Sequence, residues 1–259
     1  MKKSIKANNK NVKAIVITIL IIILIIIATG SILILNKKNK TPSILNIGEN
    51  DVKYFVLEKN GMLGVIDNTG KTIIEPKYAK IDIPNPTTDV FICLEDMSKT
   101  NYKAINSNGE NLFGQYDSTS AIEINELSSY VPYEKSVLRY KEANNYGLID
   151  FKGKKITDAI YEEISSIEYK EGFLKVKKNG KYGVINIAGK AVIPADYDDI
   201  TSDGYYNNNV KYTASGFILR TKTDNGYKYG YANKQGKVII EPMYDELNRI
   251  NEIENEKDV

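Results

Sequence analysis

The chain has 259 residues, of which 42% are hydrophobic and 26% charged, so it is long enough to bury one or two hydrophobic cores. It contains no His, which excludes Ser-His-Asp and Cys-His catalysis and the common His-bearing metal sites. The net charge of +2 hides an asymmetry, because the first 40 residues hold 8 of the 35 basic residues and no acid, leaving the remainder at −6. A mildly acidic body lacks the clustered basic face that nucleic-acid binding requires.

Residues 14–35 form an uncharged run in which Ile, Leu and Val predominate. As a helix this run would extend about 33 Å, enough to cross a bilayer. A buried core helix would carry a polar stripe, which is missing here. A cleaved signal peptide is the other alternative, because Ala28-Thr29-Gly30 suits signal peptidase. The apolar run continues to Leu35, however, and this length favours a retained transmembrane helix.

The flanks of this run suggest its orientation. Five lysines precede it and three follow it, so the positive-inside rule slightly favours a cytoplasmic tail at 1–13 and an extracellular body. Residues 36–53 are a polar linker. Cys93 is alone in the sequence, which excludes an intramolecular disulfide and a lipid-accepting Cys near the span. A composition rich in Lys, Asn and Ile without Trp is typical of a low-GC bacterium.

From residue 54 onward, short β-branched and aromatic runs alternate with Gly, Asn and Asp, as in strands joined by turns. Five segments of this region align with one another. In each, a signature position lies six residues before a second Gly, and a Tyr follows. The signature positions are Gly64, Lys103, Gly147, Gly183 and Gly230; the second glycines are Gly70, Gly109, Gly153, Gly189 and Gly236; the closing tyrosines are Tyr78, Tyr116, Tyr161, Tyr197 and Tyr244. Such units cannot bury a core alone, so neighbouring units must stack.

This pattern resembles the WG-repeat family of bacterial proteins, whose unit begins with an aromatic-Gly pair and continues through a Gly-Lys turn to Pro and Tyr-Asp. The resemblance covers about residues 54–250. The family's Trp is absent from every copy; the residues in its place are Leu63, Tyr102, Tyr146, Tyr182 and Tyr229. The second copy also has Lys103 in place of Gly, lacks the Pro before Tyr116, and is the decayed member of the array.

Each unit is predicted to contain three strands. Asn60-Gly61, Asn179-Gly180 and Asn225-Gly226 predict tight hairpin turns between the first two, because these turns need positive φ. The signature Gly marks a place where a neighbouring backbone or ring lies close. A Gly-Lys turn leads to the third strand, which ends at Pro, and the segment Tyr197–Ile200 closes the unit.

The resulting prediction is an all-β repeat domain over 54–250, followed by an acidic tail at 251–259. Two architectures satisfy the pattern: an open curved solenoid, or a closed propeller-like ring that removes exposed sheet edges. No obvious swapped strand closes a ring, so the open array is favoured.

Motifs for chemistry are sparse. The sequence has no Ser-x-x-Lys, no phosphate-binding loop and no dinucleotide fingerprint, and it predicts no cofactor, no metal and no catalytic residue. Acids recur after the closing tyrosines, as Glu162-Glu163, Asp198-Asp199 and Asp245-Glu246. Two carboxylates can hydrolyse a glycosidic bond, but the repetition favours turns or a solvated rim. A calcium site from Asp196, Asp198, Asp199 and Asp203 has the wrong spacing for an EF-hand.

The 19 Tyr residues invite a binding hypothesis, because Tyr combines a flat apolar face with a hydroxyl. The signature tyrosines are interpreted as structural. Contacts are expected instead from two variable insertions, 115–136 and 202–215, which are predicted to be loops. Their candidate contact residues are Tyr130, Tyr133, Tyr205, Tyr206 and Tyr212. The sequence thus predicts a non-catalytic extracellular binding or scaffold module for protein or cell-envelope glycan; the alternative is a carboxylate-dependent cell-wall glycan hydrolase.

Overall fold

The computed structural model describes residues 52–124, 132–167, 172–207, 210–212 and 214–247. The chain divides into two compact units, residues 1–43 and residues 44–259, and all described residues lie in the second. Within them no helix has the length and apolar character needed to span a bilayer. The predicted tail 1–13, transmembrane helix 14–35 and acidic tail 251–259 lie outside the described residues, as does Tyr130.

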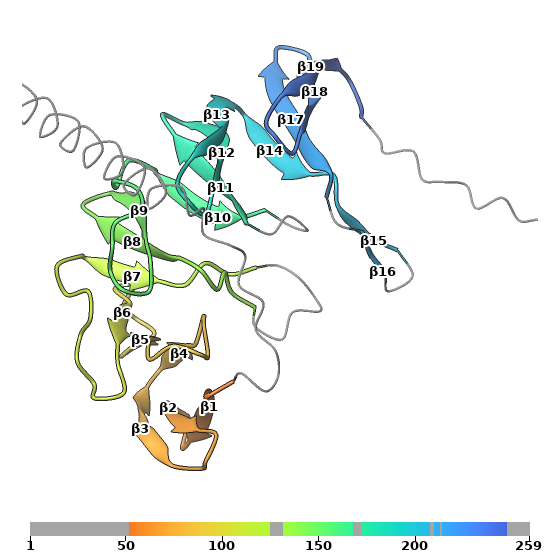
Figure 1. Ribbon diagram of the computed structural model, residues 1–259. Helices are drawn as coiled ribbons and strands as arrows, with labels where there is room; N and C mark the ends of the chain where they lie inside the picture. Colours follow the sequence, from red (N-terminus) through yellow and green to blue (C-terminus); the bar gives the residue numbers. More distant parts are fainter. Residues whose placement is uncertain (1–51, 125–131, 168–171, 208–209, 213, 248–259) are drawn as a thin grey trace, which may run out of the picture. The chain divides into compact units, whose positions relative to one another are not determined.

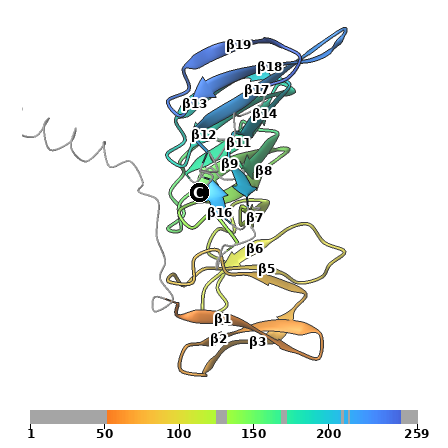
Figure 2. The same cartoon turned by 90° about the vertical axis from the view of Figure 1, so that its right-hand side faces the viewer.

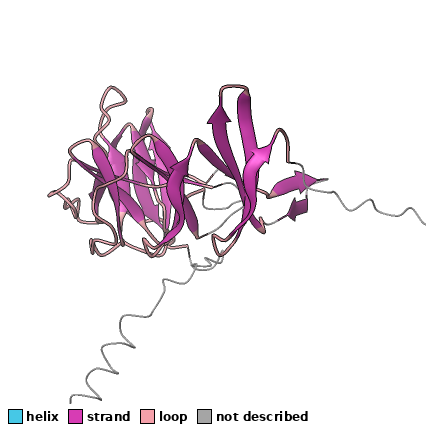
Figure 3. Cartoon of the chain, turned by 90° about the horizontal axis from the view of Figure 1, so that it is seen from above, coloured by secondary structure: helices cyan, strands magenta, loops and turns pink. Residues whose placement is uncertain are grey.

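The described residues are all-β, with strands joined by loops and turns and no helix among them (Figure 3). Five main sheets follow one another in chain order (Figures 1 and 2). The first contains β1 (Tyr54–Lys59), β2 (Met62–Asp67) and β3 (Thr72–Tyr78); the second contains β4 (Lys80–Asp82), β5 (Phe91–Leu94) and β6 (Lys103–Ile105); the third contains β7 (Ser118–Ser120), β8 (Leu138–Glu142) and β9 (Asn145–Ile149).

The last two main sheets have four strands each. The fourth contains β10 (Glu163–Ser166), β11 (Phe173–Lys178), β12 (Lys181–Asn186) and β13 (Ala191–Tyr197); the fifth contains β14 (Asp199–Ser202), β17 (Gly216–Thr223), β18 (Gly226–Asn233) and β19 (Val238–Tyr244). A separate two-stranded sheet contains β15 (Tyr205–Asn207) and β16 (Val210–Tyr212). All strand pairs in these sheets are antiparallel.

The boundary between units differs from the prediction. The residues after a closing Tyr do not end their own unit; they form the first strand of the next sheet. After Tyr197, for example, β14 pairs with β17 and not with β13. The same holds for β4, β7 and β10, each of which pairs with the hairpin that follows it. The first sheet has no such strand among the described residues, so the outer edge of β1 is unpaired there.

Both predicted turns of the unit are present. Asn60-Gly61 and Asn179-Gly180 are the two loop residues of their hairpins, and all four have positive φ. The third hairpin also forms, but its register leaves Asp224 and Asn225 in the loop, one residue earlier than predicted.

The second turn is the most regular feature of the array. In every copy an Asp or Asn side-chain oxygen accepts the backbone N–H groups two and four residues later, at 2.8–3.0 Å. The second Gly closes this turn with φ between +76° and +89°. The decayed copy keeps the turn intact at Asn106 and Gly109. The capping residues are Asp67, Asn106, Asp150, Asn186 and Asn233. The turn thus identifies all five copies as one structural unit.

The core is divided into four clusters, and each lies between two successive sheets. Val65 and Phe91 join the first pair of sheets, and Ile92 and Leu138 the second. Leu148 and Ile164 belong to the cluster between the third and fourth sheets. Val184 and Phe217 belong to the cluster between the fourth and fifth. The predicted stacking of neighbouring units is therefore what buries the apolar side chains.

Candidate functional site

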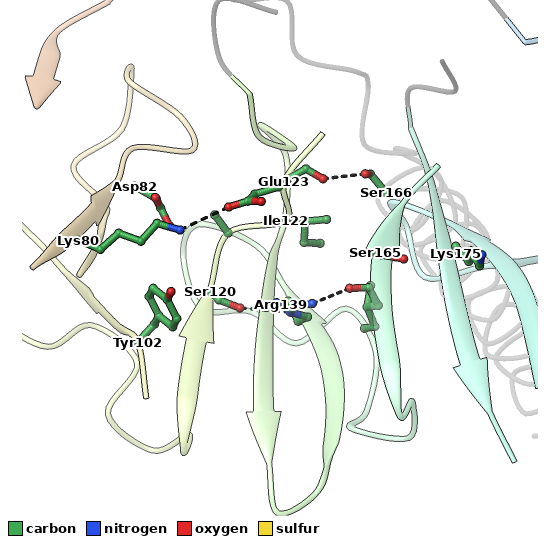
Figure 4. A pocket seen from close by; sticks show the side chains of 12 residues that line it. Lys80, Asp82, Tyr102, Ser120, Ile122, Glu123, Arg139, Ser165, Ser166 and Lys175 are labelled. Carbon is green, nitrogen blue, oxygen red and sulfur yellow. Dashed lines mark hydrogen bonds and ion pairs between the residues drawn. The ribbon is translucent and has the colours of Figure 1, made fainter. Parts of the chain in front are cut away.

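A polar cavity of about 420 Å³ extends over the first strands of three successive sheets (Figure 4). Its polar lining comes from β4, β7, β8, β10 and β11 and from neighbouring loop residues. These polar side chains are Lys80, Asp82, Tyr102, Ser120, Glu123, Arg139, Ser165, Ser166 and Lys175. A cavity built from three repeats requires the repeats to stack, so it belongs to the array and not to any single unit.

Strand alternation places these side chains. In β4, Lys80 and Asp82 flank Ile81, which is buried in the core between the first two sheets. In β7, Ser120 is next to the buried Thr119. Successive residues of a strand point to opposite faces, so each short first strand contributes one side to the core and the other to the cavity. Alternate residues of these strands therefore have different roles, since one set packs in the core and the other lines the cavity.

Three cations of the cavity lie over the rings of three signature tyrosines. The distances from the cationic group to the ring centroid are 5.6 Å for Lys80 and Tyr102, 4.9 Å for Arg139 and Tyr146, and 4.4 Å for Lys175 and Tyr182. A cation over an aromatic face is attracted by the negative potential of the ring. All three tyrosines are half-buried. In these three copies the ring that replaces the family's Trp therefore supports a positive charge beside the cavity.

At one end of the cavity, Lys80 connects two carboxylates. Its Nζ lies 3.5 Å from Asp82 Oδ2 and 3.4 Å from Glu123 Oε1. Asp82 is buried, and loss of solvent raises the pKa of its carboxyl despite the opposing hydrogen bond from Tyr133 and the charge of Lys80. The Tyr133 hydroxyl donates this bond at 2.7 Å, and burial raises its own pKa. Tyr133, a predicted ligand contact, thus holds a carboxyl of the site and does not itself line the cavity.

At the other end, Lys175 forms an ion pair with Asp199, and Asp199 also pairs with Arg220 of the fifth sheet. Lys175 comes from β11 and Asp199 from β14, so this ion pair joins the fourth and fifth sheets. Lys175 thus has a carboxylate partner, which it shares with Arg220, before any ligand arrives.

Between these two ends, Arg139 is fixed by neutral groups. Its Nη1 donates a hydrogen bond of 2.7 Å to the Ile164 carbonyl oxygen of the next sheet, and its Nε donates one of 3.2 Å to Ser120 Oγ. Figure 4 shows both bonds and places the guanidinium at the centre of the lining. Across the part of the chain that the structure describes, no carboxylate forms an ion pair with it. Sequence reasoning missed Arg139, although basic residues recur in the strand that pairs with the aromatic-Gly strand.

The other predicted contact residues lie elsewhere. Tyr205 and Tyr206 belong to β15 and Tyr212 to β16, and the backbone of Tyr205 is paired with that of Tyr212. The insertion 202–215 was predicted as a loop and contains this hairpin instead. Insertion 115–136 likewise contains β7 and buries Ala121 and Ile122 in the core. The structure therefore brings the backbones of these three tyrosines together in one hairpin.

The acids that follow the closing tyrosines have turn-stabilising roles. Glu162 accepts the N–H of Gly180 at 3.1 Å, and Asp198 accepts that of Lys222 at 2.7 Å. In the third sheet Asp117 accepts the N–H of Ala143 at 2.7 Å. Each of these carboxylates thus caps the hairpin that follows it. Among the residues that the structure describes, no group of three or more acids, Cys or His has metal-binding geometry.

The signature residues occupy equivalent places. The closing tyrosines Tyr78, Tyr161, Tyr197 and Tyr244 pair with the residues at the Trp position, which are Leu63, Tyr146, Tyr182 and Tyr229. The signature glycines Gly64, Gly183 and Gly230 lie beneath the bulge of the outer strand, where an added Cβ would meet its backbone. At Gly147 the obstacle is the ring of Tyr140, 2.5 Å from such a Cβ. The second glycines Gly70, Gly153, Gly189 and Gly236 supply the positive φ described above.

Fold and spacing together define an all-β repeat protein whose sheets stack through shared cores. The family model described as WG containing repeat matches residues 64–83, 146–182, 182–209 and 229–252. These four regions of the chain therefore match the WG containing repeat. The matches omit the decayed copy at 102–116, which keeps the second turn but not the outer strand.

Other comparisons add little. No curated protein matches the sequence. One similar solved structure is described as the crystal structure of the eukaryotic initiation factor, with 13% identity and a TM-score of 0.39, covering 78% of this chain and 58% of that one. Another is Hsv2 of Kluyveromyces lactis, with 11% identity and a TM-score of 0.34, covering 73% and 60% respectively. The chain thus spans less than two thirds of either structure.

Proposed function

We propose that this protein is a membrane-anchored, non-catalytic binding module that recognises a cell-envelope glycan through the polar cavity, with a protein ligand as the other outcome. The observation that carries this proposal is the cavity itself, in which hydroxyls, fixed charges and the Tyr102 ring converge from three sheets. Polar groups held on a rigid scaffold suit the many hydroxyls of a sugar, and an aromatic face suits its ring. The cavity has few apolar side chains for a peptide to bury, which favours glycan over protein.

The proposal includes the anchor. Residues 14–35 would span the membrane with the N-terminus in the cytoplasm, and the repeat array would face the cell exterior as an open curved array. Among the residues that the structure describes, no strand pairs with the outer edge of β1, which supports the open form over a closed ring. Expressed in cells, the full chain should stay in the membrane fraction through high-salt and carbonate washes. Recovery from the medium of a chain starting at Ser31 would contradict the anchor.

A second function, glycan hydrolysis, is favoured by one observation. Burial raises the pKa of Asp82, which shares Lys80 with the largely exposed Glu123, so two carboxyl groups in different surroundings lie in the same cavity. Lys80 stabilises the ionised form of Asp82, however, and the Tyr133 hydroxyl donates a hydrogen bond to the same carboxyl. These contacts oppose the protonated state from which a general acid acts, and binding therefore remains the proposed function.

Incubation of the detergent-solubilised full chain with purified peptidoglycan distinguishes these functions. Sedimentation of the protein with the polymer, without release of soluble fragments, is the result expected for a binding module. Fragment release that disappears in Asp82→Asn would establish the hydrolase. If the chain does not sediment with peptidoglycan but binds a surface protein, the ligand of the cavity would be a protein and not a glycan.

A further inference from the structure

Arg139 differs from the other cations of the cavity in its lack of a charged partner. Lys80 contacts two carboxylates and Lys175 one, whereas Arg139 is held by a carbonyl oxygen, a hydroxyl and the Tyr146 ring. A guanidinium has five N–H donors, and the bonds to Ser120 and Ile164 leave three of them without an acceptor among the described residues. The side chain is therefore rigid, positively charged and incompletely satisfied.

These properties suit an anionic ligand. A cation whose position is fixed before binding loses little entropy when the ligand arrives, and the ring beneath it keeps it half-buried, where a charge-assisted hydrogen bond is stronger than in water. Four cations, including Arg139, and three carboxylates make up the cavity charges and their ion-pair partners, which leaves one uncompensated positive charge. A single negative charge on the ligand would balance it.

The groups around Arg139 indicate the chemical class of the ligand. The fork of a guanidinium matches the two oxygens of a planar carboxylate. Ser165 lies on β10, the strand of Ile164, and its backbone is paired with that of Lys175. Its side-chain hydroxyl also lines the cavity and can both donate and accept a hydrogen bond. The Tyr102 ring lies on the same lining (Figure 4). Hydroxyls and an aromatic face fit a sugar ring, so the combination fits a sugar that carries a carboxylate.

We infer that Arg139 is the receptor for the carboxylate of an acidic sugar residue bound in this cavity, an inference that rests on the proposed glycan-binding function. The probe is the disaccharide of N-acetylglucosamine and N-acetylmuramic acid, which carries one free carboxylate. Its primary amide is the matched neutral probe, because it has nearly the same size and shape but no charge and only one acceptor oxygen. The full chain in detergent micelles should bind the acid about tenfold or more tighter than the amide, since a hydrogen bond to a charged group contributes about 1.5–3 kcal/mol.

Two variants test the assignment. Arg139→Met should abolish the preference for the acid, and Arg139→Lys, which keeps the charge but not the fork, should retain part of it. The control is Lys141→Met, because Lys141 also lies over the Tyr146 ring, at 5.8 Å, but does not line the cavity. That variant should keep the full preference. Thermal melting of each variant separates loss of binding from loss of folding, and rising salt should weaken the preference in the parent chain.

The outcomes are distinct. Peptidoglycan binding with equal affinity for acid and amide, or an unchanged preference in Arg139→Met, would overturn the carboxylate receptor and leave glycan binding in place. Tighter binding of glycerol phosphate than of the acid would also overturn it, in favour of a phosphate ligand. Failure to bind either peptidoglycan or the disaccharide would overturn the proposed function together with the inference.

Discussion

The second and fourth repeats contain the same turn, but they differ in the outer strand that covers the signature position. In the fourth, β13 forms a full outer strand, and its bulge lies so close that a Cβ on Gly183 would be 2.7 Å from the Ile193 carbonyl oxygen. In the second, the outer strand is reduced to a single bridge between Ile105 and Asn111. Lys103 therefore has room where Gly183 has none, and its Nζ reaches Glu95 at 3.0 Å. The signature Gly is required by the strand above it.

The second repeat replaces the missing strand with aromatic side chains. Phe113 is buried among residues of the second and third sheets, and its ring lies where a Cβ on Gly153 would be. The Tyr116 ring packs on that of Tyr140, with centroids 4.2 Å apart. A copy that decayed in sequence thus retains its interface with the next repeat, although it loses backbone hydrogen bonds.

The largest expected loss of stability tests whether Phe113 replaces the missing outer strand. Phe113→Ala should destabilise the protein by about 3–5 kcal/mol, because it removes a buried ring and leaves a cavity between two sheets. The control is Phe55→Ala, since Phe55 is 42% exposed. Chemical denaturation measures both. Equal, small losses would show that Phe113 does not replace the outer strand.

The signature position offers the next test. Gly183→Val and Gly230→Val should each cost about 2 kcal/mol or more, because a side chain there collides with the backbone of the outer strand. Lys103→Val, at the equivalent place without that strand, should change the unfolding free energy far less. Equal melting temperatures for the Gly183 and Lys103 variants would mean that the bulge does not set the requirement for Gly.

Backbone protection should differ between the two repeats even where packing is repaired. Strand β12 is hydrogen-bonded on both sides, whereas the segment 106–117 contains turns and a single bridge at Asn111 but no strand. Amides of residues 102–116 should therefore exchange faster than those of residues 182–197 in the full chain. Equal protection would show that the aromatic contacts also restore the hydrogen-bonded order.

The smallest expected effect is a change in the pKa of Glu95, which lies beside the positive charge of Lys103. Hydrogen bonds and charges from Lys99 and then Lys103 lower the pKa of Glu95 from 4.5 to about 2. A lowered pKa stabilises the folded state above pH 4.5, and this contribution is lost as the pH falls through about 2. Lys103→Gly should raise the pKa of Glu95, and Lys99→Ala should do so as well. Titration by NMR measures the shift, and an unchanged pKa in Lys103→Gly would contradict the contact.

Much of the unit could be predicted from sequence, because its turns depend on local residues. The Asn-Gly hairpins and the Asp or Asn turn before each second Gly are set by positive φ and by hydrogen bonds within five residues. The sequence could not predict whether the strand after each closing Tyr joins the preceding or the following sheet, because the repeat spacing is compatible with both. The cavity was missed for the same reason. Arg139 becomes a site residue only because Ile164, 25 positions away, presents a carbonyl oxygen from the next sheet.

Hydrogen exchange of the full chain with and without soluble, carboxylate-bearing peptidoglycan fragments tests the central claim most directly. The account predicts slower exchange in the strands that line the cavity, β7 and β10, and little change in the outer strand β13. The slowing should be lost in Arg139→Met and kept in Lys141→Met. Ligand-induced protection confined to the β15–β16 hairpin, or no protection in the presence of bound fragments, would contradict the assignment of the cavity as the binding site.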